Sequence, residues 1–303
     1  NFIWILLEII SIFLLFIVLK KIFKFEYQLR NILLILFSFG STIFMSFISG
    51  NISVILYGLL ALGIYFLYKK LFNFYYLIVL FVSLFKFYYL AFFILPFYIL
   101  GWKSLKNIIA YLFLFFVIQY SFYLKNPDLT IAFFEVIQGN IEGNLPIRFQ
   151  TGTGLYSIIE KMPWVFTGIN DFEKSFFPLE INFLIWFVVS FTITLTTFFC
   201  LNSEKIKKSK KHFLFCISFG VLIINLIFPR LVVYDLILTV PILFYLLNQI
   251  NFTKLGINEF KSRFFIIFLF LVIFDHHFPF FISISFLSLF IYSELYKKNV
   301  FTS

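Results

Sequence analysis

The chain has 303 residues, of which 62% are hydrophobic and 13% are charged, whereas soluble domains carry about 25% charged residues. This composition excludes a soluble globular domain and indicates a polytopic membrane protein, because apolar runs of about 20 residues recur along the chain. The net charge of +10 arises from basic residues in short segments beside the apolar runs, which is the pattern that sets membrane orientation. It does not predict a nucleic-acid partner.

The apolar runs predict an all-α fold, a polytopic transmembrane helical bundle. We expect about 10–11 membrane segments, several of them re-entrant or half-length, because some runs are shorter than the roughly 20 helical residues that cross a bilayer core. All of them would belong to a single transmembrane domain over residues 1–303. The predicted segments are 2–19, 31–49, 52–68, 74–86, 88–100, 107–124, 181–200, 213–228, 232–249, 264–275 and 279–293.

Basic residues between these segments predict the orientation of the chain. Placing all of them in the cytoplasm gives one consistent threading, as short cytoplasmic loops are enriched in Lys and Arg. The densest of these loops is "NSEKIKKSKKH". The groups are Lys20, Lys21, Lys24 and Arg30, then Lys69 and Lys70, then Lys103 and Lys106, then Lys205, Lys207, Lys208, Lys210 and Lys211, then Lys254, Lys261 and Arg263, and finally Lys297 and Lys298.

The stretch from Phe74 to Leu100 is apolar apart from Lys86. A single helix there would carry Lys103 and Lys106 to the outer side, against the positive-inside rule. Two short helices that turn near Lys86 keep every basic loop in the cytoplasm, and we therefore expect this hairpin.

With this threading, most of the unusual polar residues face outward at the ends of several helices. Charges at a membrane edge are costly and mark functional sites by default. The outward set comprises "ISGNIS" at 48–53, Lys86, the segment 125–179, "PRLVVYD" at 229–235 and "DHHFP" at 275–279.

Residues 125–179 form the one long extramembrane segment, which is predicted to be an extracytoplasmic loop with interfacial helices. Residues 128–138 have the pattern of an amphipathic helix, with Asp128 near its positive N-terminal end. Trp164 is a typical interfacial anchor. We expect the loop to roof a cavity over the outer helix ends, and the alternative is a disordered surface loop.

Several motifs resemble glycosyltransferase family 87 of the GT-C superfamily, the polyprenol-phosphate-mannose-dependent mannosyltransferases. They are "SGNIS", "SLFKFYYLAFFILPFYIL" followed by "GWKSLK", "RFQTGTGLYSIIEKM" and "FPRLVVYDLILTVP". The resemblance covers the chain from about Ile32 to Leu247. It implies a GT-C type helical bundle in the cell inner (plasma) membrane, with an active site that faces away from the cytoplasm.

The resemblance implies transfer of a hexose, mannose in the family, from a polyprenyl-phosphate donor to a cell-envelope glycan or glycolipid acceptor. The alternative function is a transporter or flippase of lipid-linked sugars. GT-C enzymes place an essential acidic residue in the first outer loop, and this chain starts with Asn1 inside an apolar run. We therefore expect the N-terminal part of the full protein, and the catalytic acidic residue with it, to lie upstream of Asn1.

Arg230 is the best candidate for binding the donor phosphate, because a guanidinium offers a planar, permanently charged fork for phosphate oxygens. The alternative is a structural ion pair between Arg230 and Asp235. Lys86 is the second phosphate candidate, and its alternative is a lysine that snorkels to the interface. Asp235 would hold Arg230 or bind acceptor hydroxyls, and Tyr234 would line the sugar site.

Asn51 and His276 complete the predicted substrate-binding set, Asn51 as a sugar contact and His276 as a hydrogen-bonding partner of phosphate or sugar. Their alternatives are a close helix approach at Asn51 and an interfacial turn at His276. Adjacent histidines on a helix point about 100° apart, so we expect no metal site at His276 and His277. Two cysteines, Cys200 and Cys216, indicate neither a disulfide framework nor a metal site. We expect no cofactor.

Overall fold

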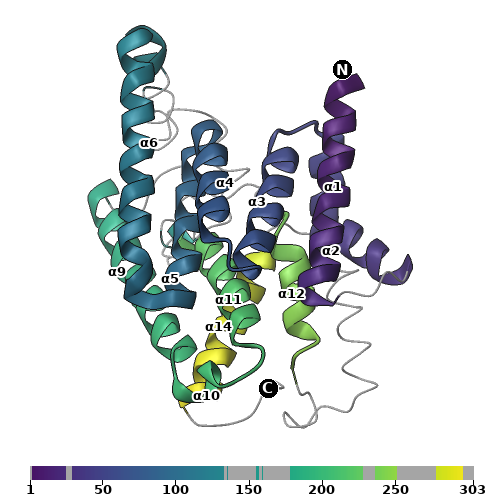
Figure 1. Ribbon diagram of the computed structural model, residues 1–303. Helices are drawn as coiled ribbons and strands as arrows, with labels where there is room; N and C mark the ends of the chain where they lie inside the picture. The colour runs from purple at the N-terminus through teal and green to yellow at the C-terminus, as the bar shows by residue number, and fades with distance from the viewer. Residues whose placement is uncertain are drawn as a thin grey trace.

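The structure is a computed structural model that describes residues 2–24, 29–132, 135, 155–156, 159, 178–227, 236–250 and 278–295. These residues form helices joined by turns, with no β-strand among them, as the sequence predicts (Figure 1). The α-helices are α1 Phe2–Phe23, α2 Leu29–Ile48, α3 Ser53–Tyr68, α4 Phe72–Phe85, α5 Ile94–Leu100, α6 Leu105–Lys125, α9 Leu179–Leu201, α10 Glu204–Lys207, α11 His212–Ile227, α12 Thr239–Leu247 and α14 Phe278–Leu295. Two 3₁₀ helices, η1 Phe87–Phe93 and η2 Gly101–Ser104, flank α5.

Three helical stretches of the described residues are long and apolar enough to cross a membrane: Phe2–Phe23, Phe87–Lys125 and Glu180–Leu201. The protein is therefore a helical membrane protein in character. One predicted segment is observed as a shorter helix, and another is not among the described residues. The segment 232–249 contains only a short helix, Thr239–Leu247, among its described residues, and 264–275 lies outside the described residues.

The basic ends of α1 and α3 lie together. The ammonium groups of Lys21 and Lys69 lie 5.3 and 5.8 Å from the centre of the Tyr65 ring, within the range of a cation–π interaction. Tyr68, the last residue of α3, contacts the start of α11, where its ring lies 5.5 Å from the ring of Phe213. Helices α1 and α3 therefore run in the same direction, and their C-terminal ends meet the N-terminal end of α11.

Two hydrogen bonds concern the ends of four helices at this same side, which we call the basic end. Lys211 Nζ donates to Gln249 Oε1 at 2.9 Å, joining the start of α11 to the end of α12. Ser203 Oγ donates to Glu294 Oε2 at 3.1 Å, joining the end of α9 to the end of α14. Figure 1 shows α10 at the opposite end of the bundle from the N-terminus of α1. Lys21, Lys69 and Lys211 therefore lie at one end of the bundle.

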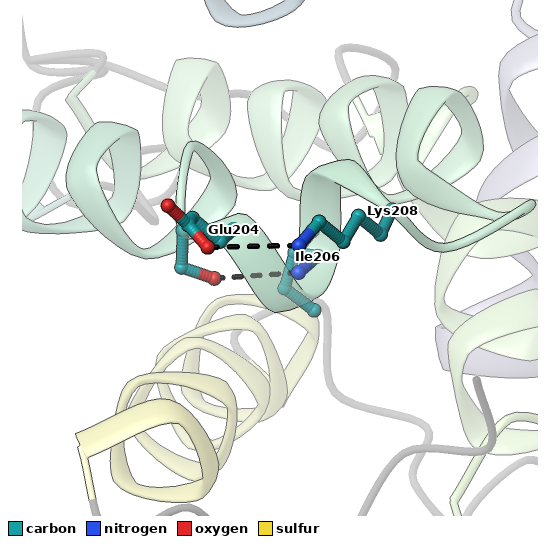
Figure 2. Close-up of polar contacts among 4 residues, drawn as sticks. Glu204, Ile206 and Lys208 are labelled. Atoms are coloured by element: carbon teal, nitrogen blue, oxygen red, sulfur yellow. Dashed lines mark hydrogen bonds and ion pairs between the residues drawn. The ribbon is translucent and has the colours of Figure 1, made fainter.

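Helix α10 is a single turn fixed by its own side chains at the basic end. The Ser203 hydroxyl accepts a hydrogen bond from the backbone N–H of Ile206 at 3.4 Å, which caps the helix start. Figure 2 shows this contact beside the ion pair of Lys208 with Glu204, 3.6 Å apart. Both charged side chains are more than 80% exposed, so the ion pair adds little stability.

The predicted hairpin at Lys86 is confirmed. Helix α4 ends at Phe85, and Lys86 has an extended backbone with φ −142° and ψ 105°, which breaks the helix. The chain then returns through η1 and α5 and reaches Lys103 in η2. The returning segment starts as a 3₁₀ helix rather than as the helix that the apolar run predicts.

A proline explains one long-range contact in this hairpin. Pro96 has no N–H and cannot donate to the carbonyl four residues before it, that of Phe92. The hydroxyl of Tyr75 on α4 donates to that carbonyl at 2.6 Å, in addition to a backbone N–H at the end of η1. Tyr75 is fully buried, so the bond joins the two arms of the hairpin inside the bundle.

Helices α1 and α3 pack closely because a glycine faces a serine. A Cβ at Gly58 would lie 2.6 Å from Cβ of Ser11, closer than real Cβ atoms approach. The contact fixes the relative height of the two parallel helices. Glu8 lies about one turn from Ser11 toward the N-terminal end of α1. Ser53, the first residue of α3, lies about a turn and a half from Gly58 in the same direction.

The helices end at different heights on the side opposite the basic end. At 1.5 Å per residue, α1 and α6 are about 32 Å long, whereas α3 is about 24 Å and α4 about 21 Å. Figure 1 shows the ends of α1 and α6 extending past those of α3 and α4. The turns at Gly50 and Lys86 therefore lie lower than the ends of the two long helices.

The predicted outer loop is described only in part. Residues 127–132 are helical, which agrees with the start of the helix predicted for 128–138. Leu155 and Tyr156 are buried, and the Tyr156 ring lies 5.1 Å from that of Phe183 on α9. The rest of the predicted roof lies outside the described residues.

Candidate functional site at the outer helix ends

Lys86 is held over the start of α3. Its Nζ donates a hydrogen bond to Ser53 Oγ at 2.5 Å, across 33 residues of sequence. The same Nζ lies 5.6 Å from the centre of the Tyr88 ring. Lys86 is half-buried and Ser53 is fully buried. The cation is thus fixed where α3 begins and α4 ends, at the opposite end of the bundle from the lysines of the basic end.

Asn51 shapes the turn that presents Ser53. Its side-chain oxygen accepts a hydrogen bond from the Ser53 backbone N–H at 2.9 Å, which satisfies a donor at the start of α3. Gly50 precedes it with φ +62°, a left-handed conformation that glycine adopts without strain. The predicted Asn51 is therefore beside Lys86, and the contact seen for its side-chain oxygen is a local one that orders the turn.

A cavity of about 460 Å³ lies on the α1 side of the same turn. It is lined by Trp4, Ile5, Glu8, Phe47, Ile48 and Gly50. Glu8 is only 2% exposed, and its Oε1 has no hydrogen-bond partner. The Trp4 side chain lines the cavity beside the Glu8 carboxyl. The cavity thus combines apolar and aromatic walls with one carboxylate oxygen that is not satisfied by the protein.

One turn of the chain connects the cavity to the lysine. Gly50 lines the cavity, Asn51 caps the turn, and Ser53 binds Lys86. Because Gly58 and Ser11 fix the heights of α3 and α1, Glu8 lies about one turn outward of that contact, near the level of the first turn of α3. A cation and a carboxylate are therefore presented on the two sides of the α2–α3 turn.

This arrangement suits an anionic group next to a hydroxylated one. A fixed ammonium stabilises phosphate oxygens and the negative charge that builds on a leaving phosphate. A carboxylate oxygen with a free lone pair accepts a hydrogen bond from a hydroxyl group. No group of three His, Cys, Asp or Glu residues that could hold a metal ion occurs in the part of the chain that the structure describes.

The other predicted site residues lie outside the described residues: Arg230, Tyr234, Asp235 and His276. On either side of the "PRLVVYD" segment, Asn225 on α11 hydrogen-bonds to Thr239 on α12, so the two described helix ends face each other. Cys200 and Cys216 are both buried. Of the six predicted substrate-binding residues, the structure therefore describes Lys86 and Asn51, and it brings them to one turn.

Glu8, Trp4 and Ser53 are the residues that the sequence analysis missed. Glu8 is the one charged residue between Asn1 and Leu19, and a lone carboxylate in an apolar run is a signal for a functional residue. Ser53 carries no such signal, since serine is common in this chain's helices. Its role depends on Lys86, which is distant in sequence.

Comparisons of the chain with protein families, with curated proteins and with solved structures found no match.

Proposed function

We propose that the protein is a membrane glycosyltransferase of the GT-C type that moves a hexose from a polyprenyl-phosphate donor to a glycan or glycolipid acceptor. The reaction would take place on the outer face of the cell inner (plasma) membrane. The observation that carries the proposal is the Lys86 ammonium, held by Ser53 at the outer helix ends. The resemblance of the "SGNIS" and "SLFKFYYL" motifs to family 87 supports it, because these motifs contain Ser53 and Lys86.

In the proposed reaction, an acceptor hydroxyl oxygen attacks the anomeric carbon of the donor sugar. The bond from that carbon to the phosphate oxygen breaks, and its electron pair leaves with the polyprenyl phosphate. A base takes the hydroxyl proton. Lys86 stabilises the phosphate as negative charge develops, and a fixed donor of this kind accelerates such reactions by about 10²–10³-fold.

The test uses the purified protein in liposomes with a radiolabelled polyprenyl-phosphate-mannose donor and acceptor-containing membranes. We expect transfer of label to acceptor, reduced about 100-fold or more in Lys86→Ala and partly retained in Lys86→Arg. Lys125→Ala is the matched control, because Lys125 ends α6 on the same side and is exposed. Equal losses in the Lys86 and Lys125 variants would refute the proposal. Movement of sugar across the vesicle without a new glycosidic bond would instead identify a transporter.

A further inference from the structure

We infer that the cavity around Glu8 and Trp4 is a binding site for one neutral, polyhydroxylated ring, such as a pyranose or a cyclitol. The inference deepens the proposed function, on which it rests only in naming this ring as part of the acceptor. Binding itself follows from the cavity and its carboxylate and needs no donor.

The first argument is the state of the Glu8 carboxyl. Glu8 is 2% exposed where it lines the cavity beside Trp4, and its Oε1 is buried without a partner. A buried polar atom without a partner costs about 1–3 kcal/mol, so such atoms are uncommon in folded proteins and need a reason. A ligand hydroxyl in the cavity would give this carboxyl a hydrogen-bond partner.

The second argument is the size and lining of the cavity. Its volume of about 460 Å³ equals that of about fifteen liquid water molecules, which is ample for a single ring with its hydroxyl groups. It also lies within the common range of ligand cavities. Trp4 and Phe47 supply aromatic surface, and Ile5 and Ile48 supply aliphatic surface. These walls match the C–H faces of a sugar ring, and Glu8 matches its hydroxyl edge.

The third argument separates a hydroxylated ring from a cation. An ammonium group is small and strongly hydrated, and it would leave most of this volume unfilled. Cation recognition also favours cages of several aromatic faces, whereas two of the six described lining residues are aromatic. The fixed cation Lys86 on the other side of the turn adds repulsion for a positively charged ligand and attraction for an anionic neighbour.

The cavity also has a position suited to an acceptor. Gly50 forms part of its wall, and three residues later Ser53 binds Lys86. A ring in the cavity would therefore lie next to the group that we assign to the donor phosphate. One hydroxyl of the ring would be held by the Glu8 side chain. Glu8 belongs to α1, a helix fixed against α3 by the contact of Ser11 with Gly58.

The experiment measures binding without any donor, by saturation-transfer NMR on the purified protein in lipid nanodiscs. The probes are methyl α-mannopyranoside, methyl β-glucopyranoside and myo-inositol, with choline chloride as competitor. We expect saturable binding of at least one neutral probe, weakened at least tenfold by Glu8→Gln. Glu204→Gln, which changes an exposed glutamate at the basic end, should leave binding unchanged.

A second variant keeps the carboxylate and removes the space. Ile5→Trp fills the cavity from its wall and should abolish binding while Glu8 remains. Binding that survives both changes, absence of binding by all three neutral probes, or displacement by choline at lower concentration than by sugar would each overturn the inference. Sugar transfer that depends on Lys86 without binding at Glu8 would refute this inference alone. Binding at Glu8 without any transfer would refute the proposed function alone.

Discussion

The hydrogen bond from Tyr75 to the Phe92 carbonyl can be tested against an unusually close control. Tyr75 and its neighbour Tyr76 are both fully buried on α4. The Tyr75 hydroxyl donates to Phe92 at 2.6 Å, whereas the Tyr76 hydroxyl has no hydrogen-bond partner. Replacing either residue by phenylalanine removes one oxygen and keeps the ring, so the two variants differ mainly in the bond that is lost.

The expected cost follows from the hydrogen bond that Tyr75→Phe removes. Pro96 offers the Phe92 carbonyl no N–H, but this carbonyl keeps a backbone N–H donor at the end of η1, so the cost is that of one net hydrogen bond, about 0.5–1.5 kcal/mol. Hydrogen bonds between membrane helices have measured values of about 0.6 kcal/mol on average and at most about 1.7 kcal/mol. We therefore expect Tyr75→Phe to lower the free energy of unfolding by about 0.5–1.5 kcal/mol.

Tyr76→Phe should change stability by less than about 0.5 kcal/mol, or raise it, because removing an unsatisfied buried hydroxyl removes a desolvation cost. The assay is SDS-induced unfolding of the purified protein in mixed micelles, followed by circular dichroism. An equal loss in the two variants would show that the ring environment, and not the bond to Phe92, determines the cost. The account of the hairpin through Pro96 would then be wrong.

Two further predictions concern the helix contact below the site and the basic end. Gly58→Ala places Cβ 2.6 Å from Ser11 Cβ and should cost about 1–3 kcal/mol in the same SDS assay. Gly63→Ala, whose nearest neighbour is the Cγ2 methyl of Ile78 at 3.3 Å, should cost less, and equal costs would contradict this packing. Burial lowers the pKa of the Lys211 ammonium in the folded state from its usual 10.5. Between this lowered pKa and 10.5, the unfolded state binds more protons than the folded state, so stability should rise as the pH increases toward 10.5. Thermal melts at pH 7 to 10 should show this rise in the native chain and a smaller one in Lys211→Gln, and identical pH profiles would contradict it.

Part of the fold could be predicted, because helices and turns follow from the lengths of apolar runs and the positions of charged residues along the sequence. The turn at Lys86 follows from where the neighbouring lysines must lie, and the structure confirms it. The 3₁₀ geometry of η1 and the Tyr75 bond could not be predicted in this way. They depend on which of the 17 tyrosines lies opposite the carbonyl that receives no N–H from Pro96.

The candidate site could be predicted only in part, because it also depends on contacts between residues that are distant in sequence. Lys86 and Asn51 stand out as polar residues at helix ends, and they lie at one turn. Glu8 stands out in the sequence only as a charge in an apolar run. That it faces a cavity follows from the direction in which α1 presents it, and the contact between Ser11 and Gly58 fixes that direction. Packing between helices distant in sequence determines the carboxylate's surroundings.

The short length of α3 and α4 has a consequence for the lipid around the protein. A bilayer core is about 30 Å thick, whereas α4 spans about 21 Å. With the basic ends of α3 and α4 level with that of α1, Lys86 lies several ångströms inside the hydrocarbon core, below the level of the headgroups. Hydrocarbon cannot solvate an ammonium group, so the bilayer must thin locally or water must enter from above. A polyprenyl phosphate in the surrounding leaflet would then reach this lysine by sinking slightly, without leaving the membrane.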